Sequence, residues 1–200
     1  MTTTVASLGV AEIESLVDHL EKHLGRIDAG WSVDPDGERM PFQVVKFSRG
    51  SDLESVAYST LGLSPHVLRS PRSGRAIRQE LMMLAPLAPQ HDVVVSLLLQ
   101  VGAMALANDR ALLRGEVIGP AGPLAEGSRL TSFYVGSPVY FPDEFATYAG
   151  PAGEVVVAWL VPVSDAEAGL VARAGWEALE NEFVLRDPDL VDFHRPPMQV

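Results

Sequence analysis

The chain has 200 residues, of which 47% are hydrophobic and 20% are charged, so it can bury the core of one large domain or two small ones. Its formal net charge of −11 disfavours nucleic acid as a partner, because phosphate binding needs clustered Lys and Arg. The absence of cysteine excludes disulfides, thiolate metal sites and cysteine nucleophiles. The first residues carry neither a positive n-region nor an apolar h-region, so we expect a cytoplasmic protein without a secretory signal.

Helical patterns occur in three segments. Residues 10–24 place apolar side chains every three or four positions and end before Gly25, which predicts an amphipathic surface helix. Residues 90–108 are apolar on almost every side, so a helix here should be buried centrally. Polar interruptions leave it short of the roughly 18 apolar residues of a membrane span, and no membrane association is expected. The third helix begins at a capping box formed by Ser164 and Glu167. Its apolar face is expected to join Ala172, Trp176, Leu179 and Phe183.

Strand patterns separate these helices. Short apolar runs bounded by Gly, Pro and Asp predict strands, and the first two should form a hairpin across the turn residues 49–52. Residues 31–41 are expected to form a loop, because Asp34-Pro35-Asp36-Gly37 has the composition of a tight turn. Pro162 cannot donate to a sheet ladder, so it should mark the end of the last strand. The expected strands cover 42–47, 55–61, 75–84, 116–118, 130–135 and 155–163.

The predicted elements follow one another as helix, strands, helix, strands and helix, without a low-complexity linker. This order predicts a single α+β domain, with a mixed or mostly antiparallel sheet, a buried central helix and flanking helices. Residues 1–39 are expected to form an N-terminal helix and loop that pack on the main part of the domain, residues 40–197.

Two motifs look like fragments of catalytic sites. His19 and His23 have the i, i+4 spacing of two metal ligands, but Leu20 stands where zinc proteases carry their glutamate base. We therefore expect these histidines to lie on a solvated helix face, and we predict no metal and no cofactor. The second motif, residues 62–66, lacks the second glycine of a nucleophile elbow and is expected to be a turn that ends a strand.

Charged residues cluster in two places. Arginines recur every three residues from Arg69 to Arg78 and could hold a phosphate or carboxylate, but a partly salt-bridged loop and strand is the simpler interpretation. The stretch 177–192 is strongly acidic, and its simplest use would be to steer a basic protein partner. Asp192 could instead be a structural partner of Arg195. The candidate partner-binding residues are Glu177, Glu180, Asp187, Asp189 and Asp192.

Several short pieces of sequence form a consistent pattern between residues 40 and 197. They are Thr60-Leu61-Gly62-Leu63-Ser64, then Gln79-Glu80-Leu81-Met82-Met83-Leu84, then Leu160-Val161-Pro162-Val163, and lastly Glu167, Gly175, Leu179 and residues 192–195. In this order and spacing they resemble the Suppressor-of-fused-like domain family, in its bacterial single-domain form.

The resemblance implies an α/β domain whose relatives bind proteins and are not known as enzymes. The animal member binds a zinc-finger transcription factor with two domains, whereas this chain has room only for the first, so that role should not transfer. Bacterial relatives include immunity proteins of polymorphic toxin systems, which neutralise a toxin by binding it. The resemblance implies a non-catalytic, immunity-type inhibitor that binds a co-encoded toxin. The acidic charge is compatible with a basic toxin domain as its partner.

Two other functions stay open. A small hydrolase or metal-dependent enzyme would need His66, His91 and His194, which are far apart in the sequence, to converge with carboxylates. A secretion adaptor or chaperone would hold its client without inhibiting it. The partner and the oligomeric state are left undetermined.

Overall fold

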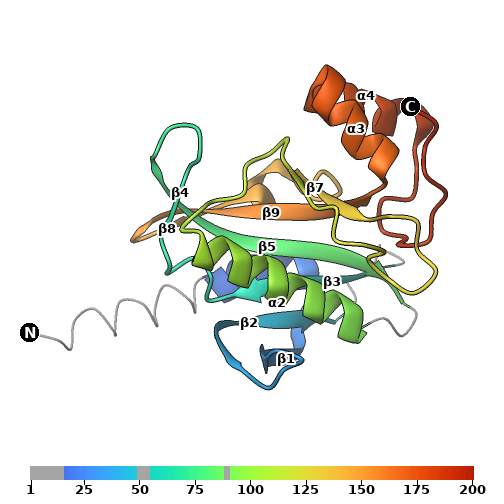
Figure 1. The fold of residues 1–200 in the computed structure, drawn as a ribbon. Helices are drawn as coiled ribbons and strands as arrows, with labels where there is room; N and C mark the ends of the chain where they lie inside the picture. Colours follow the sequence, from blue (N-terminus) through green and yellow to red (C-terminus); the bar gives the residue numbers. More distant parts are fainter. Residues whose placement is uncertain (1–15, 49–54, 88–90) are drawn as a thin grey trace, which may run out of the picture.

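The computed structural model describes residues 16–48, 55–87 and 91–200, and at its centre lies a nine-stranded mixed sheet (Figure 1). The main path of the sheet runs β1-β2-β3-β5-β9-β7-β6, while β4 pairs with β5 and β8 pairs with β9. Neighbouring strands are antiparallel except for β5 and β9, which are parallel. The strands are β1 (Ile27–Val33), β2 (Arg39–Phe47), β3 (Ser55–Leu61), β4 (Leu68–Arg69), β5 (Ala76–Pro86), β6 (Val117–Ile118), β7 (Ser132–Gly136), β8 (Thr147–Gly150) and β9 (Gly153–Val163). This mixed sheet and its helices confirm the α+β fold.

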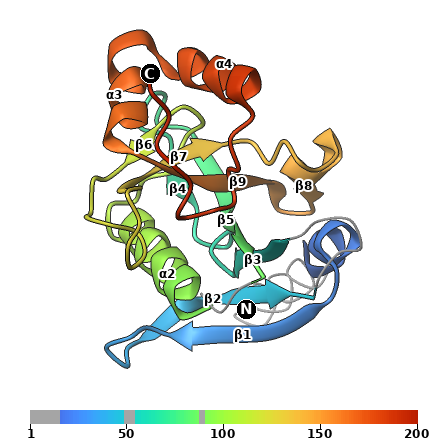
Figure 2. The same cartoon turned by 90° about the vertical axis from the view of Figure 1, so that its right-hand side faces the viewer.

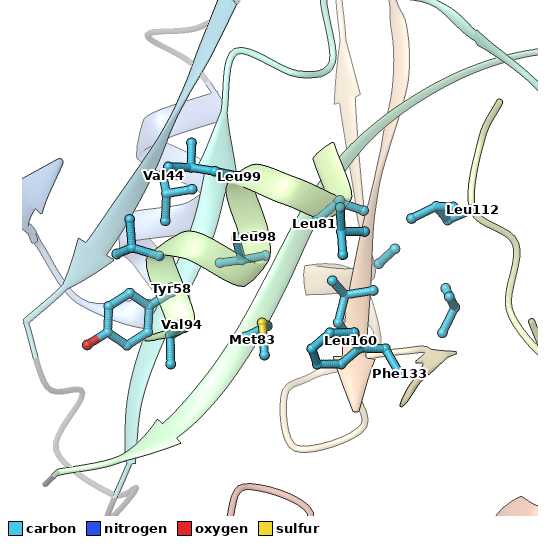
Figure 3. Close-up of a cluster of buried hydrophobic side chains, with 14 of the residues drawn as sticks. Val44, Tyr58, Leu81, Met83, Val94, Leu98, Leu99, Leu112, Phe133 and Leu160 are labelled. Carbon is cyan, nitrogen blue, oxygen red and sulfur yellow. The ribbon is translucent and has the colours of Figure 1, made fainter. Parts of the chain in front are cut away.

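The two long central strands alternate their side chains between two separate cores. In β5, Leu81 and Met83 belong to the core on one face, and Met82 and Leu84 belong to the core on the other. This two-residue period is the pleat of a strand that is buried on both faces. Figure 3 shows the first core, where side chains of β2, β3, β5, β7 and β9 meet helix α2.

Helix α2 (His91–Ala107) lies along one face of the sheet (Figure 2). It has few polar residues because its inner side buries apolar side chains, while Asp92, Gln100 and Ala107 on its outer side are exposed. The sheet, rather than the helix, therefore forms the middle layer. Within the described residues, no helix combines the length and apolar character needed to cross a bilayer.

The opposite face is covered by the N-terminal and C-terminal helices. The helix over residues 16–24 buries Leu16, Leu20 and Leu24 in the second core. The part of this predicted helix before residue 16, like the predicted turn 49–52, lies outside the described residues. The C-terminal elements, α3 (Asp165–Ala174) and α4 (Trp176–Arg186), lie side by side beyond β7 and β9 (Figures 1 and 2).

Two local predictions are wrong. The predicted loop 31–41 contains the end of β1 and the start of β2, and only the tight turn between them is irregular. The predicted third helix is two helices, because Gly175 has a φ of 87° and turns the chain between them. An L side chain rarely adopts this conformation, whereas glycine does so without cost from a Cβ. Ala172 is exposed as a result and does not continue the apolar face of α4.

The capping box at the start of α3 is confirmed and has a larger role than capping. Ser164 and Glu167 exchange the two expected hydrogen bonds. The buried carboxylate of Glu167 also accepts bonds of 2.7 and 2.8 Å from the two terminal nitrogens of Arg195. Arg195 donates in addition to the Pro162 carbonyl, and the N–H of Met198 donates to Glu167. This cluster fixes the C-terminal segment against the end of β9.

A second buried carboxylate, that of Glu80, explains the turn after β3. The backbone N–H groups of Gly62, Leu63 and Ser64 all donate to it, and the Thr60 hydroxyl donates at 2.5 Å. Burial raises the pKa of Glu80, and these hydrogen bonds act in the opposite direction. The predicted turn is therefore a structural cradle for the protein's own carboxylate.

Candidate functional site

The acidic residues selected from the sequence gather at one end of the molecule, on α4 and the segment that follows it. Glu177 is exposed on the first turn of α4, and Glu180 lies one turn further along. Asp187 ends the helix in a left-handed conformation, with its N–H bonded to the Phe183 carbonyl. Asp189 is exposed and accepts a hydrogen bond from the Val191 N–H.

Glu180 is not a free surface charge. Its carboxylate accepts hydrogen bonds from Arg114, at 3.0 Å from Nε and 2.5 Å from Nη2. The hydroxyl of Tyr134, a residue of β7, donates a third bond of 2.6 Å. These hydrogen bonds from Arg114 to Glu180 raise the pKa of Arg114. The pKa of Tyr134 is raised mainly by burial and secondly by its hydrogen bond to Glu180. This network attaches α4 to the sheet.

Packing of Trp176 strengthens the same attachment. The guanidinium of Arg114 lies 4.7 Å from the centre of the Trp176 ring, a cation–π contact. Gly115, at a φ of 91°, lies beneath the indole, and a Cβ built on it would come within 2.6 Å of the ring. The first half of α4 is thus fixed by contacts with the segment before β6.

The second half of α4 borders an apolar groove of about 180 Å³. Trp159 and Val161 of β9, together with Tyr134 and Gly136 of β7, lie on the sheet side of the groove. The other residues that line it are Ser137, Val139, Glu180, Phe183, Val184 and Leu190. Strand ends, a helix and the C-terminal segment therefore combine to form a hollow that no one of them could form alone.

Large apolar side chains are exposed beside this groove. Val184 is 85% exposed and Val139 is 66% exposed, although both line the groove. Leu185 and Tyr140, their neighbours in the chain, are also exposed, and the Tyr140 ring lies 5.1 Å from that of Trp159. Exposed apolar side chains that lie together mark interaction surfaces more often than isolated ones do.

Two of the acidic residues border this apolar surface. Burial raises the pKa of the Tyr140 hydroxyl, and the carboxylates of Asp189 and Asp187 raise it further. The Tyr140 hydroxyl also lies near the backbone of Leu190, which lines the groove. Asp187 ends α4 three residues after Val184, and Asp189 directly precedes Leu190, so two exposed carboxylates lie beside residues that line the groove. The nearby Arg186 is paired with Glu182.

Asp192 has a local role instead. Its carboxylate accepts a 2.8 Å bond from the His194 N–H, and its carbonyl oxygen accepts a 3.3 Å bond from the Arg195 N–H. Asp192 is therefore a backbone partner of Arg195, whose side chain binds Glu167 instead. The side-chain partner of Arg195 lies 28 residues away in the sequence, so local spacing does not reveal it.

The enzyme hypothesis needs His66, His91 and His194 to converge, and the two whose side chains the structure describes do not form a catalytic cluster. His66 is exposed in the turn after β3. His194 is exposed as well, with Nε2 at 2.9 Å from the Glu126 carbonyl oxygen and Nδ1 at 3.8 Å from Asp192. The structure does not describe the side chain of His91.

His19 and His23 do not lie on a solvated face, and the prediction to that effect is wrong. The His19 Nε2 is 3.1 Å from the Phe145 carbonyl oxygen, and the His23 side chain is only 7% exposed. The 3₁₀ helix η1 (Asp143–Ala146) covers them, with Phe145 against both rings. In the described ranges, no group of three or more His, Asp or Glu side chains could hold a metal ion.

Comparison with known proteins supports one family. The family model of the Suppressor of fused protein (SUFU) matches residues 38–196. A Suppressor of fused homolog from Neisseria gonorrhoeae shares the fold with a TM-score of 0.71 at 20% identity, over 96% of this chain and all of that chain. A search of curated proteins finds no significant match.

Two further solved structures have the same fold. A structure of the Sufu–Fu complex matches with a TM-score of 0.65 at 18% identity, over 85% of this chain and 82% of that one. Drosophila Suppressor of Fused matches with a TM-score of 0.66 at 18% identity, over 94% of this chain but only 50% of its own length. Because the family model spans most of the sequence, the chain belongs to the Suppressor of fused protein (SUFU) family.

Proposed function

We propose that this chain is a non-catalytic protein-binding domain, and that it acts as a cytoplasmic, immunity-type inhibitor of a basic toxin domain encoded beside it. The observation that carries the proposal is the apolar groove between α4 and the sheet, beside which Asp187 and Asp189 are exposed at the end of α4 and just before Leu190. The Sufu–Fu complex, an assembly that contains a protein of this fold, is consistent with it.

The proposed surface has the composition of a protein interface. Such interfaces commonly have an apolar centre and a polar rim, and aromatic residues are enriched in them. Here Tyr140 and Phe183 supply the aromatic surface above the buried ring of Trp159, and the aspartates supply the neighbouring charge. The formal net charge of −11 would also speed the approach of a basic partner, since complementary charge raises association rates.

Co-expression with the product of the neighbouring gene tests the function. Expression of that product alone should arrest growth, and co-expression of this chain should restore growth and yield a complex that co-purifies. The variant Asp187→Lys with Asp189→Lys should restore growth less well. The matched variant Asp36→Lys with Glu154→Lys, at an exposed turn and at the exposed start of β9, should protect like the native chain.

Two results would contradict the proposal in different ways. If neither a complex nor a rescue of growth is found, the immunity role is wrong. If a complex forms but the neighbouring product stays fully active within it, the chain is an adaptor or chaperone that holds a client without inhibiting it.

A further inference from the structure

The geometry points to a single-anchor mode of recognition: the groove at α4 receives one large apolar side chain of the partner, flanked by Lys or Arg residues that face Asp187 and Asp189. This inference deepens the proposed function and rests on it, since it says how the protein partner is held. The argument follows from the size of the groove, its exposure and its charge.

The size of the groove selects one side chain rather than a small-molecule ligand. Sites for drug-sized ligands and cofactors typically have about 300–1,000 Å³. A groove of about 180 Å³ is smaller than this range. It is close to the roughly 150 Å³ of an apolar cavity that accommodates a benzene ring. One phenylalanine or leucine side chain is therefore the occupant that fits.

The walls of the groove are held in place by the protein's own contacts. On one side, Glu180 is bonded to Arg114 and Tyr134, so its carboxylate is already satisfied before a partner arrives. On the other side, Leu190 is itself packed into the second core at 7% exposure, and the clamp between Glu167 and Arg195 holds the chain shortly after it. A groove with fixed walls loses little conformational entropy when it is filled, which favours binding.

The open side of the groove is apolar and its rim is negative. Val184 and Val139 remain largely exposed, so an anchor that enters between them would remove apolar surface from water on both sides. Asp187 ends α4 three residues after Val184, and Asp189 directly precedes Leu190, so both exposed carboxylates lie next to residues that line the groove. A cation beside the anchor would face these carboxylates, whereas an acidic neighbour would be repelled.

A peptide probe tests this inference without the natural partner. The blocked peptide Lys-Lys-Phe-Lys-Lys is titrated into the ¹⁵N-labelled full chain, and the expected result is a saturable shift of the Gly136 and Ser137 amides and of the Trp159 indole. One anchor of this kind should bind with a dissociation constant of about 1 mM, which NMR measures readily. The peptides Lys-Lys-Ala-Lys-Lys and Glu-Glu-Phe-Glu-Glu should each bind at least about fivefold more weakly.

Two neighbouring substitutions on α4 make a matched pair. Val184→Lys places a charge in the groove and should weaken binding of the phenylalanine peptide by about tenfold. Leu185→Lys makes the same change of charge at a side chain that is also exposed but does not line the groove, so it should have at most about a twofold effect. Both positions are exposed, so both variants should fold.

The outcomes separate this inference from the proposed function. Equal weakening by the two α4 variants, or shifts that avoid the groove residues, would overturn the single-anchor mode. If the co-encoded protein binds the Val184→Lys variant as tightly as the native chain, the mode is overturned while the inhibitor function stands. If the peptide binds as expected but no co-encoded protein is neutralised, the groove is a recognition site and the immunity role is wrong.

Discussion

Replacing Arg195 by methionine should be strongly destabilising, because it leaves a buried carboxylate without its cation. The two terminal nitrogens of Arg195 bind both oxygens of Glu167 at 2.7 and 2.8 Å, and the Glu167 side chain has no exposed surface. After the substitution, Glu167 would keep hydrogen bonds only from the N–H groups of Ser164 and Met198. Breaking a buried pair in this way costs about 3–5 kcal/mol.

Urea denaturation followed by tryptophan fluorescence measures this loss, since Trp159 is buried in the core and reports on unfolding. In a thermal melt followed by the same fluorescence, each kcal/mol lowers the melting temperature of a chain of this size by about 2–4 °C, so Arg195→Met should lower it by about 6–20 °C. Arg173→Met, at an exposed position at the end of α3, is the matched control and should stay within about 0.5 kcal/mol of the native chain.

The double variant Glu167→Gln with Arg195→Met separates the lost charge pair from lost packing. It removes both charges, so it should be more stable than Arg195→Met alone. Burial acts to raise the pKa of Glu167, but the hydrogen bonds from Arg195 and Met198 outweigh it and hold the pKa below its ordinary value of 4.5. The stabilisation is therefore present above pH 4.5 and is lost as the pH falls through the lowered value. If Arg195→Met is no less stable than Arg173→Met, the clamp does not contribute as argued.

Three other substitutions test separate parts of the structure. Burial, followed by the positive charges of nearby side chains, lowers the pKa of His23 below its ordinary value of 6.5. The unfolded chain therefore takes up this proton first, and the free energy of unfolding should fall as the pH drops below 6.5. Urea titrations at several pH values should show a smaller fall for His23→Phe. Gly102→Ala should cost about 1–3 kcal/mol by the same assay, because the new Cβ would lie 2.5 Å from the Phe42 ring; a gain in stability would contradict this packing. Arg114→Ala removes two hydrogen bonds to Glu180 and the cation–π contact with Trp176, so it should cost about 1 kcal/mol. It should also change the fluorescence of Trp176, and an unchanged spectrum would contradict the network.

Local signals in the sequence predicted much of the fold. The capping box needs only Ser164 and Glu167, three residues apart, so the start of α3 could be predicted from the sequence. The strands could also be predicted, because the alternation of apolar and polar side chains and the turn residues between strands are local signals too. The break at Gly175 was missed because a single glycine within a helical pattern does not by itself show whether the helix continues.

The candidate site could be predicted only in part, because its contacts join distant segments. Acidity alone drew attention to Asp187 and Asp189, which are next to residues that line the groove. It also selected Glu180, whose partner Arg114 lies 66 residues away and cannot be inferred from local spacing. The groove itself arises where β7, β9, α4 and the C-terminal segment meet, and only the fold brings them together.

Hydrogen–deuterium exchange on the complex with the co-encoded toxin domain tests most directly whether this groove is the binding surface. Compared with the free chain, the complex should slow exchange over residues 136–140 and 180–190, the two segments that border the groove. Protection confined to another surface, with these segments exchanging as in the free chain, would contradict the central claim.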